Sequence, residues 1–300
     1  MKKIITLMLV AVLAVCALSG CGTSKSGEDT KDKKIKIVTT IFPEYDWVMQ
    51  ILGDKADKAD VTMLLDKGVD LHSYQPSTAD IAKISEADVF IYVGGESDEW
   101  VEDVLKEAKN KKLKDGKEEE EVEYDEHVWL SLKNAKIFTK KIADVLSEVD
   151  KADAKTYQAN YESYAKKLDD LDKKYADAVA SAKNKTLVFG DRFPFRYLVN
   201  DYGLDYYAAF VGCSAESEAS FETVTFLAKK IDELGLGNVL TIEGKNHKIA
   251  KTVVDNTKNK DQKVLTMDSM QSTTSKDVKD GATYLGIMEK NLEVLKEALK

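Results

Sequence analysis

The chain has few cysteines and prolines, three of each in its 300 residues, and this scarcity limits how the fold can be stabilised. Cys16 and Cys21 lie in or directly after an apolar N-terminal segment, so Cys213 is the single cysteine of the remainder. A lone cysteine cannot form an intramolecular disulfide, and the fold must therefore rest on a hydrophobic core. The roughly 265 residues beyond the N-terminal segment and its polar continuation can supply one large or two smaller lobes.

The chain also lacks an excess of positive charge. It has 44 Lys and Arg against 53 Asp and Glu, a formal net charge of -9 at pH 7. Binding to a phosphate backbone needs clustered Lys and Arg, so we expect no nucleic acid partner. An acidic chain is compatible with attracting cations.

The apolar N-terminal run is too short for an ordinary membrane span. It covers residues 4–18, follows the basic Lys2 and Lys3, and ends in Leu-Ser-Gly-Cys at Cys21. This pattern resembles a bacterial lipoprotein signal. It predicts a signal peptide at 1–20, lipidation of Cys21, and a flexible polar tether at 21–34 that holds the protein on the extracytoplasmic face of the cell membrane. The alternative is an ordinary secretory signal in which Cys21 is incidental.

Beyond the tether, short apolar runs alternate with helical patterns. The runs expected to be buried strands are residues 36–40, 61–65, 88–94, 186–189, 206–211, 239–242 and 264–267. The helical patterns between and after them are residues 43–52, 78–86, 97–109, 221–234, 247–257 and 284–299. Alternating strands and helices are typical of a parallel sheet covered on both faces. The sequence therefore predicts an α/β fold of two lobes, each with a mainly parallel sheet.

Two further helical patterns, at 132–149 and 153–181, separate the two sets of alternating segments. In the second, apolar and aromatic residues recur every three or four positions. A helix of about 29 residues would be roughly 43 Å long, enough to join two lobes. We therefore predict an N-terminal lobe at 35–150, a linking backbone helix at 151–182 and a C-terminal lobe at 183–300.

Polar residues stand where several predicted strands end. In open α/β sheets, ligands bind beyond the carboxyl ends of the strands. His72 follows the strand at 61–65 and precedes a helix for which Ser77 is the expected N-cap. Taken singly, each acidic candidate is better explained as a helix cap or turn residue. Taken together, two imidazoles with carboxylates suit Zn²⁺ or Mn²⁺. The candidate ligands are His72, His127, Asp191, Glu243 and Asp268.

Three other features have plain explanations. The charged run at 110–126 is expected to be a solvated loop. A weak cation-collecting flap is the alternative, because the run ends next to His127. Cys213 is expected to be a buried inert thiol. His247 stands among lysines and is expected to be a solvated surface residue.

Four motifs carry a family resemblance. They are His-x-Tyr-x-Pro-Ser at 72–77, the strand and glycine turn at 89–95, His127-Val128-Trp129-Leu130 before Asn134-Ala135, and Asp268-Ser269 after the last strand. With them, the chain from Cys21 onward resembles the cluster A-I solute-binding proteins, the metal-binding lipoprotein subunits of bacterial zinc or manganese ABC importers. The resemblance implies that His72, His127 and Asp268 bind the transported metal. It also implies two lobes bridged by a rigid helix and a membrane permease as partner, and we expect a monomer.

Two departures from the family pattern leave the metal open. Family members have a histidine or a glutamate after the strand that corresponds to 186–189, whereas this chain has Gly190 there. Asp191 could substitute by a one-residue shift, Glu243 could take the role, or water could complete the shell. The acidic run at 110–126 also lacks the histidines typical of zinc members. Zinc is the expected cargo, and manganese is the alternative.

The sequence favours binding over catalysis. It has no His-Glu-x-x-His pair, so a secreted metallohydrolase is only an alternative. A binding protein for a chelated metal or haem would need a cleft lined with arginine and aromatic side chains. The single cluster of that kind is Arg192 and Arg196 beside Phe193, Phe195 and Tyr197. For an adhesin, a label often given to this family, the sequence offers no feature for or against.

Overall fold

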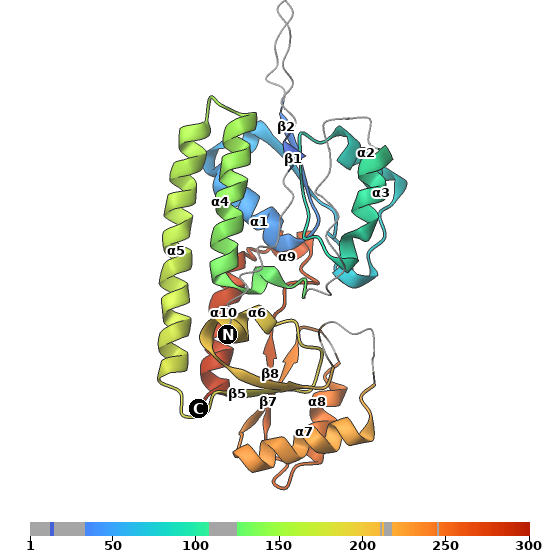
Figure 1. The fold of residues 1–300 in the computed structure, drawn as a ribbon, viewed down its shortest axis with the longest axis vertical. Helices are drawn as coiled ribbons and strands as arrows, with labels where there is room; N and C mark the ends of the chain where they lie inside the picture. Colours follow the sequence, from blue (N-terminus) through green and yellow to red (C-terminus); the bar gives the residue numbers. More distant parts are fainter. Residues whose placement is uncertain (1–12, 15–33, 108–124, 211, 213–217, 245) are drawn as a thin grey trace, which may run out of the picture. The chain divides into compact units, whose positions relative to one another are not determined.

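The computed structural model describes residues 13–14, 34–107, 125–210, 212, 218–244 and 246–300 (Figure 1). Internal contacts divide the chain into two units. Unit 1 comprises Met1–Glu126 and Ile137–Tyr164, and unit 2 comprises His127–Lys136 and Ala165–Lys300. The predicted lipidation site, the tether up to residue 33, most of the acidic run and Cys213 lie outside the described residues.

The sheet of unit 1 is built on three parallel strands. Strand β2 (Ile35–Thr39) lies between β3 (Ala59–Met63) and β4 (Val89–Ile91), and Ile37 pairs with a valine on each side. The central strand is buried from Ile37 to Thr39, as expected for a strand covered on both faces. The two residues of β1 (Leu13–Ala14) pair antiparallel with β4. They belong to the predicted signal peptide, so cleavage would remove this pairing.

The helices of unit 1 start and stop at recognisable residues. Helix α1 (Phe42–Leu52) has a proline in its first turn and ends at Gly53, whose φ of 54° favours glycine. Helix α2 (Thr78–Glu86) begins with a capping box, in which Ser77 and Asp80 bond to each other's backbone N–H, so the predicted Ser77 cap is confirmed. Helix α3 (Glu99–Glu107) and the 3₁₀ turns η1 (Gly53–Lys58), η2 (Leu71–Ser73) and η3 (Glu96–Asp98) complete this part of the unit.

The sheet of unit 2 is entirely parallel. Its strands are β5 (Thr186–Phe189), β6 (Asp205–Ala208), β7 (Asn238–Ile242) and β8 (Lys263–Met267), in the order β6-β5-β7-β8. Helix α7 (Phe221–Leu234) contacts β5, α8 (Lys248–Asp255) contacts β7, and α10 (Tyr284–Ala298) contacts β8. The 3₁₀ turn η4 (Val128–Leu130) and the short helices α6 (Arg196–Tyr202) and α9 (Ser275–Lys279) also belong to this unit. Two parallel-strand sheets covered by helices confirm the predicted α/β class.

Two longer helices, α4 (Leu132–Val149) and α5 (Ala154–Ala180), come between the sheets in the sequence. Helix α5 has 27 residues, close to the predicted length. Its aromatic and leucine stripe is buried, with Tyr157 and Tyr175 both 0% exposed. Residues of α5 up to Tyr164 belong to unit 1, and those after it belong to unit 2.

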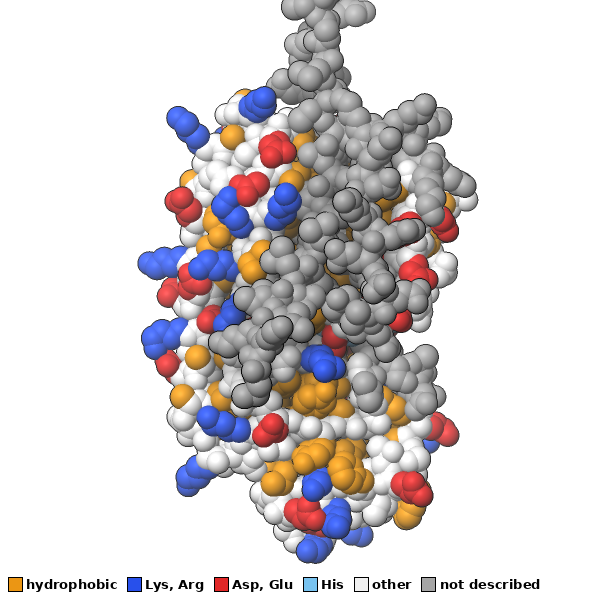
Figure 2. Space-filling view, viewed as in Figure 1, with side chains coloured by type: hydrophobic (Ala, Val, Ile, Leu, Met, Phe, Trp, Pro, Cys, Tyr) orange, Lys and Arg blue, Asp and Glu red, His pale blue; other side chains and the backbone are white. Residues whose placement is uncertain are grey.

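The observed elements differ from the predicted ones mainly at their ends. Strand β4 stops at Ile91 although the apolar run continues, because the glycines at 94 and 95 turn the chain with positive φ. The short helices α6 and α9 were not predicted, because seven and five residues are too few for a clear periodic pattern. Within the described residues, no helix is both long and apolar enough to cross a membrane. On the face drawn in Figure 2, described side chains of both charge signs are interspersed, as on an ordinary solvated surface.

Candidate functional site

His72 stands on the loop that follows β3 in unit 1. The loop turns at Gly68, whose φ is 74°, and Asp70 then caps the short turn η2 by accepting a hydrogen bond from the backbone N–H of His72 (3.1 Å). This bond fixes the backbone that carries the imidazole. The side chain of His72 is 25% exposed, so it is accessible but not fully solvated.

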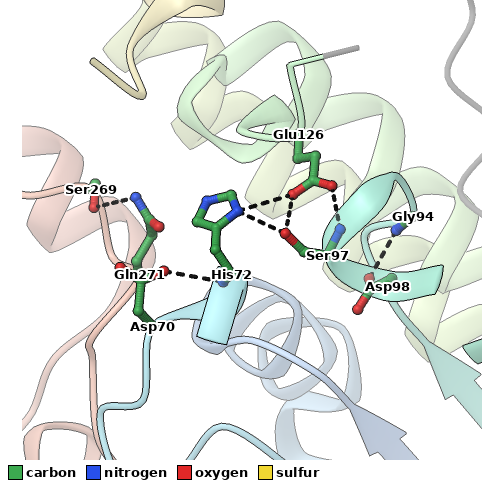
Figure 3. Close-up of polar contacts among 8 residues, drawn as sticks. All are labelled: Asp70, His72, Gly94, Ser97, Asp98, Glu126, Ser269 and Gln271. Atoms are coloured by element: carbon green, nitrogen blue, oxygen red, sulfur yellow. Dashed lines mark hydrogen bonds and ion pairs between the residues drawn. The ribbon is translucent and has the colours of Figure 1, made fainter. Parts of the chain in front are cut away.

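The His72 ring is held by a serine and a glutamate (Figure 3). Its Nδ1 lies 2.7 Å from Ser97 Oγ and 3.5 Å from Glu126 Oε2. Ser97 in turn donates from its backbone N–H and its hydroxyl to the two carboxylate oxygens of Glu126, at 2.6 and 2.5 Å. Carboxylates that reach a histidine in this way fix the ring's orientation and its tautomer.

Glu126 is only 5% exposed, although the sequence places it at the end of the acidic run. Its carboxyl group packs on the glycine turn after β4, where a Cβ on Gly95 would come within 2.6 Å of Glu126 Oε1. The expectation of a solvated loop is therefore wrong for this residue. The run appeared uniformly solvated because no sequence pattern distinguishes a buried glutamate from its neighbours.

In unit 2, His127 is 2% exposed and its ring packs on Trp129, with 5.1 Å between the centroids. Trp129 Nε1 donates to the carbonyl of Ser269 (2.9 Å), and Tyr284 Oη donates to the carbonyl of Trp129 (2.6 Å). These bonds fasten the His127 segment to the turn after β8. The structure thus brings two of the predicted motifs, the His127 segment and the Asp268-Ser269 turn, into contact.

Asp268 and Glu243 follow the neighbouring strands β8 and β7. Both Glu243 oxygens accept from Ser269, one from its backbone N–H (2.7 Å) and one from its hydroxyl (2.6 Å). Asp268 Oδ1 accepts from the backbone N–H of Met270 (2.8 Å). Burial, with a smaller contribution from the Glu243 carboxylate, raises the pKa of Asp268 to about 6. Two close carboxylates in a partly buried place favour a cation beside them.

Asp191 and His247 belong to one hydrogen-bonded chain at the end of β7. Asp191 Oδ2 accepts from the hydroxyl of Thr241 and from the backbone N–H of Ile242 (3.3 Å), and its Oδ1 accepts from the backbone N–H of Arg192 (2.9 Å). The Thr241 hydroxyl also lies 3.1 Å from His247 Nδ1. His247 is half-buried and hydrogen-bonded, so describing it as a solvated surface residue was wrong.

Gly190 has no room for a side chain. A Cβ at this position would lie 2.5 Å from the Cα of Ala250 and 2.9 Å from its Cβ, at the point where β5 meets helix α8. Gly190, where the resemblance implied a metal ligand, is therefore a packing position in this chain.

Two of the three aromatic residues beside Arg192 are buried in the core. Phe193 and Phe195 are 1% and 0% exposed, and both pack on Phe189, with ring centroids 5.1 and 5.5 Å away. They belong to the core of unit 2. Packing in the core thus explains two of the aromatic residues that favoured a chelated metal or haem as ligand.

The described parts of the chain contain no group of three or more His, Cys, Asp or Glu side chains close enough together to hold a metal ion. The predicted ligands are instead divided between the two units. His72 is in unit 1, and His127, Asp191, Glu243 and Asp268 are in unit 2.

The sequence did not single out the residues that hold these side chains. Ser97 and Ser269 each present a backbone N–H and a hydroxyl to one glutamate, and Thr241 connects Asp191 to His247. Ser269 and Thr241 lie at the carboxyl ends of β8 and β7, so their place on the sheet was available as a signal. Their hydrogen bonds depend on tertiary contacts, and a sequence pattern does not contain those.

Comparison with known proteins supplies the family. The model described as "Zinc-uptake complex component A periplasmic" matches residues 37–298. The chain belongs to this family. The chain is also 30% identical over 315 residues to the high-affinity zinc uptake system protein ZnuA of Bacillus subtilis, and the match covers 96% of each protein.

Other relatives of this family are longer. The zinc-binding lipoprotein AdcA of Streptococcus pneumoniae strain R6 is 33% identical over 320 residues, and the match covers 99% of this chain and 61% of AdcA. The chain thus spans about three-fifths of such relatives. Among solved structures, the Zn(II)-bound ZnuA-like domain of S. pneumoniae AdcA has a TM-score of 0.73 and 32% identity, covering 89% of this chain and 99% of that domain. The chain therefore matches this one domain of AdcA almost completely and covers 58% of the Zn(II)-bound AdcA structure.

Proposed function

We propose that this protein is the extracytoplasmic receptor of an ABC importer, which captures Zn²⁺ and delivers it to a membrane permease. Family membership and the zinc-binding relatives support this proposal. The observation that carries it is the contact between the two motifs in unit 2, where Trp129 hydrogen-bonds to the turn that contains Asp268. That bond holds an imidazole segment and a carboxylate segment together, and these are the donor types that zinc uses in proteins.

The proposed protein ligands are His72, His127 and Asp268, with Glu243 or Asp191 as a further carboxylate. The raised pKa of Asp268 supports its role, because a carboxylate that is costly to ionise alone is stabilised by a bound cation. We propose that the ligands converge as the ion binds, by a modest movement of loops or lobes around the long helix. Release to the permease would reverse that movement.

We further propose a lipid anchor on Cys21 after removal of a signal at 1–20, with residues 21–34 as the tether. The protein would then act as a monomer on the outer face of the membrane, with lobes at 35–150 and 183–300 and a backbone helix at 151–182. It would bind no nucleic acid and carry out no catalysis. Anchoring at a membrane keeps the captured ion close to the permease.

The ligands can be tested by titrating Zn²⁺ against a competing chelator. We expect His72→Ala, His127→Ala and Asp268→Ala each to weaken zinc binding by at least ~10-fold, since each removes a metal-bonding atom. Glu289→Ala, an exposed change on helix α10, is the control and should bind like the wild type. Wild-type affinity in all three ligand variants would overturn the proposed site.

The choice of metal needs a separate measurement. Elemental analysis of protein purified without chelator should find zinc, and direct competition should favour Zn²⁺ over Mn²⁺. Zinc is expected to win at almost any nitrogen and oxygen site in vitro, so the metal content of the purified protein is the more informative result. Protein that carries manganese from zinc-replete cells would contradict zinc as the cargo.

A further inference from the structure

The histidines at 72 and 247 are held in the same way, one in each unit. In unit 1, Ser97 Oγ lies 2.7 Å from His72 Nδ1 and also bonds to the Glu126 carboxylate. In unit 2, Thr241 Oγ1 lies 3.1 Å from His247 Nδ1 and also bonds to the Asp191 carboxylate. In each unit, hydrogen bonds therefore link a carboxylate to a hydroxyl and that hydroxyl to Nδ1 of the histidine.

The direction of these hydrogen bonds follows from the number of protons. A hydroxyl has one proton to donate, and an ionised carboxylate can only accept. The Ser97 and Thr241 hydroxyls therefore donate to Glu126 and Asp191, and each accepts from the imidazole beside it. Both neutral rings are then in the tautomer that carries its proton on Nδ1. In that tautomer, Nε2 has the lone pair with which imidazole binds metals.

The position of His247 in unit 2 fits a metal ligand. It lies at the start of α8, four residues after Glu243, beyond the carboxyl end of β7. Asp268 follows the adjacent strand β8 in the same parallel sheet. Ligands bind beyond this edge in sheets of this kind. His247 is thus at the edge that already holds two proposed ligands.

Gly190 and Asp191 explain why another ligand is needed. The backbone of Ala250 blocks a side chain at position 190. The Asp191 carboxylate accepts three hydrogen bonds, from Thr241, Ile242 and Arg192, and these direct it into the protein. A group with those partners is suited to orient a neighbour, as carboxylates behind metal-bound histidines do.

We infer that His247 is a third imidazole ligand for the transported metal, through Nε2, and that Asp191 acts on it through Thr241 as a positioning residue. This inference rests on the proposed zinc function and completes its ligand set as His72, His127, His247 and Asp268. Three nitrogens and one carboxylate oxygen make a four-coordinate shell of the kind zinc adopts. The metal site would then use all three histidines of the chain.

Zinc X-ray absorption spectroscopy tests this directly on the full chain, purified without a histidine tag. Because the chain has three histidines, an imidazole count of three around bound zinc can come only from His72, His127 and His247. We expect three in the wild type and two in His247→Ala. A count of two in the wild type would overturn the inference without the need for any variant.

Affinity measurements separate the ligand from the residues that position it. His247→Ala should weaken zinc binding by at least ~10-fold, comparably to His72→Ala. Thr241→Val keeps the shape of the side chain but removes the hydroxyl, so it should weaken binding by ~10-fold while leaving three imidazoles on the metal. Lys251→Ala, an exposed change on helix α8, is the control and should leave both readouts unchanged.

The outcomes distinguish this inference from the function on which it rests. If His72→Ala and His127→Ala lose zinc affinity while His247→Ala keeps it, the inference is wrong and the proposed function stands. If none of the three changes affects binding, the proposed function itself fails. If Thr241→Val binds like the wild type while His247→Ala is weakened, His247 is a ligand and the positioning role of Asp191 is wrong.

Discussion

Glu44 is a buried acid at the start of α1 in unit 1. It is 4% exposed, and its Oε2 accepts from the N–H and the hydroxyl of Thr40, each at 2.9 Å. Burial, with a smaller contribution from the carboxyl group of Asp98, raises the pKa of Glu44 to about 8. The folded protein therefore binds the Glu44 proton more tightly than the unfolded chain does.

This difference makes stability depend on pH. The contribution of Glu44 to the free energy of unfolding is fully present below its ordinary pKa of 4.5 and is lost as the pH rises to about 8. At about 1.4 kcal/mol for each pKa unit, the loss is on the order of a few kcal/mol. Denaturant unfolding at pH 5, 6.5 and 8 should show a smaller decrease in Glu44→Gln than in the wild type. Equal decreases in the two proteins would contradict the burial of a protonated Glu44.

Gly190 should tolerate no larger residue. In Gly190→Ala, the new methyl group would meet the backbone of Ala250, which cannot rotate away as a side chain could. Overpacking of this kind costs about 1–3 kcal/mol. We therefore expect the free energy of unfolding to fall by about that amount, with a lower denaturant midpoint. Gly237→Ala is the matched control, because a Cβ there has no heavy atom within 4 Å. A Gly190→Ala protein as stable as this control would show that β5 and α8 can separate at little cost.

At the scale of elements, helix α10 holds the end of strand β8. Asn291 is 1% exposed, and its side chain accepts from the N–H of Asp268 and donates to the carbonyl of Asp268, both at 2.8 Å. Asn291→Ala leaves these two backbone groups without that partner, at about 1–3 kcal/mol each. We expect lower stability in denaturant and weaker zinc binding, because the Asp268 backbone is no longer fixed. Glu289→Ala, an exposed change two residues away, should alter neither stability nor zinc affinity. Unchanged zinc affinity in Asn291→Ala would show that the Asn291 hydrogen bonds to the Asp268 backbone are not needed for metal binding.

Elements with local signals were predictable, and those that depend on distant contacts were not. Ser77 caps the start of α2, and Gly235, with a φ of 65°, ends α7. Both ends were predictable because serine is a preferred N-cap and glycine a preferred residue after a helix. The motif around His72 also stands there. The burial of Glu126, by contrast, comes from Ser97, which lies 29 residues earlier in the chain. His247 was misjudged because lysines near it in the sequence predict a solvated segment, whereas its ring turns to Thr241 in the sheet.

At the scale of the whole molecule, bound zinc should stabilise the folded chain by mass action. A ligand that binds only the folded state adds about 2.7 kcal/mol when its concentration is 100 times its Kd. For domains of 150–250 residues this corresponds to a Tm increase of about 5–10 °C, and excess chelator should reverse it. Differential scanning calorimetry with and without Zn²⁺ measures the increase.

The same measurement at lower pH tests whether imidazoles carry the binding. Neutral imidazole binds metal and imidazolium does not, and a free imidazole takes up its proton near pH 6.5. The zinc-induced increase in Tm should therefore be large at pH 7.5, smaller at pH 6 and nearly absent at pH 5. With three imidazoles on the metal it should fall more steeply with pH than with two, so His247→Ala should show a shallower dependence. An increase that persists at pH 5 would mean that carboxylates alone hold the ion, and the histidines at 72, 127 and 247 would then need another role.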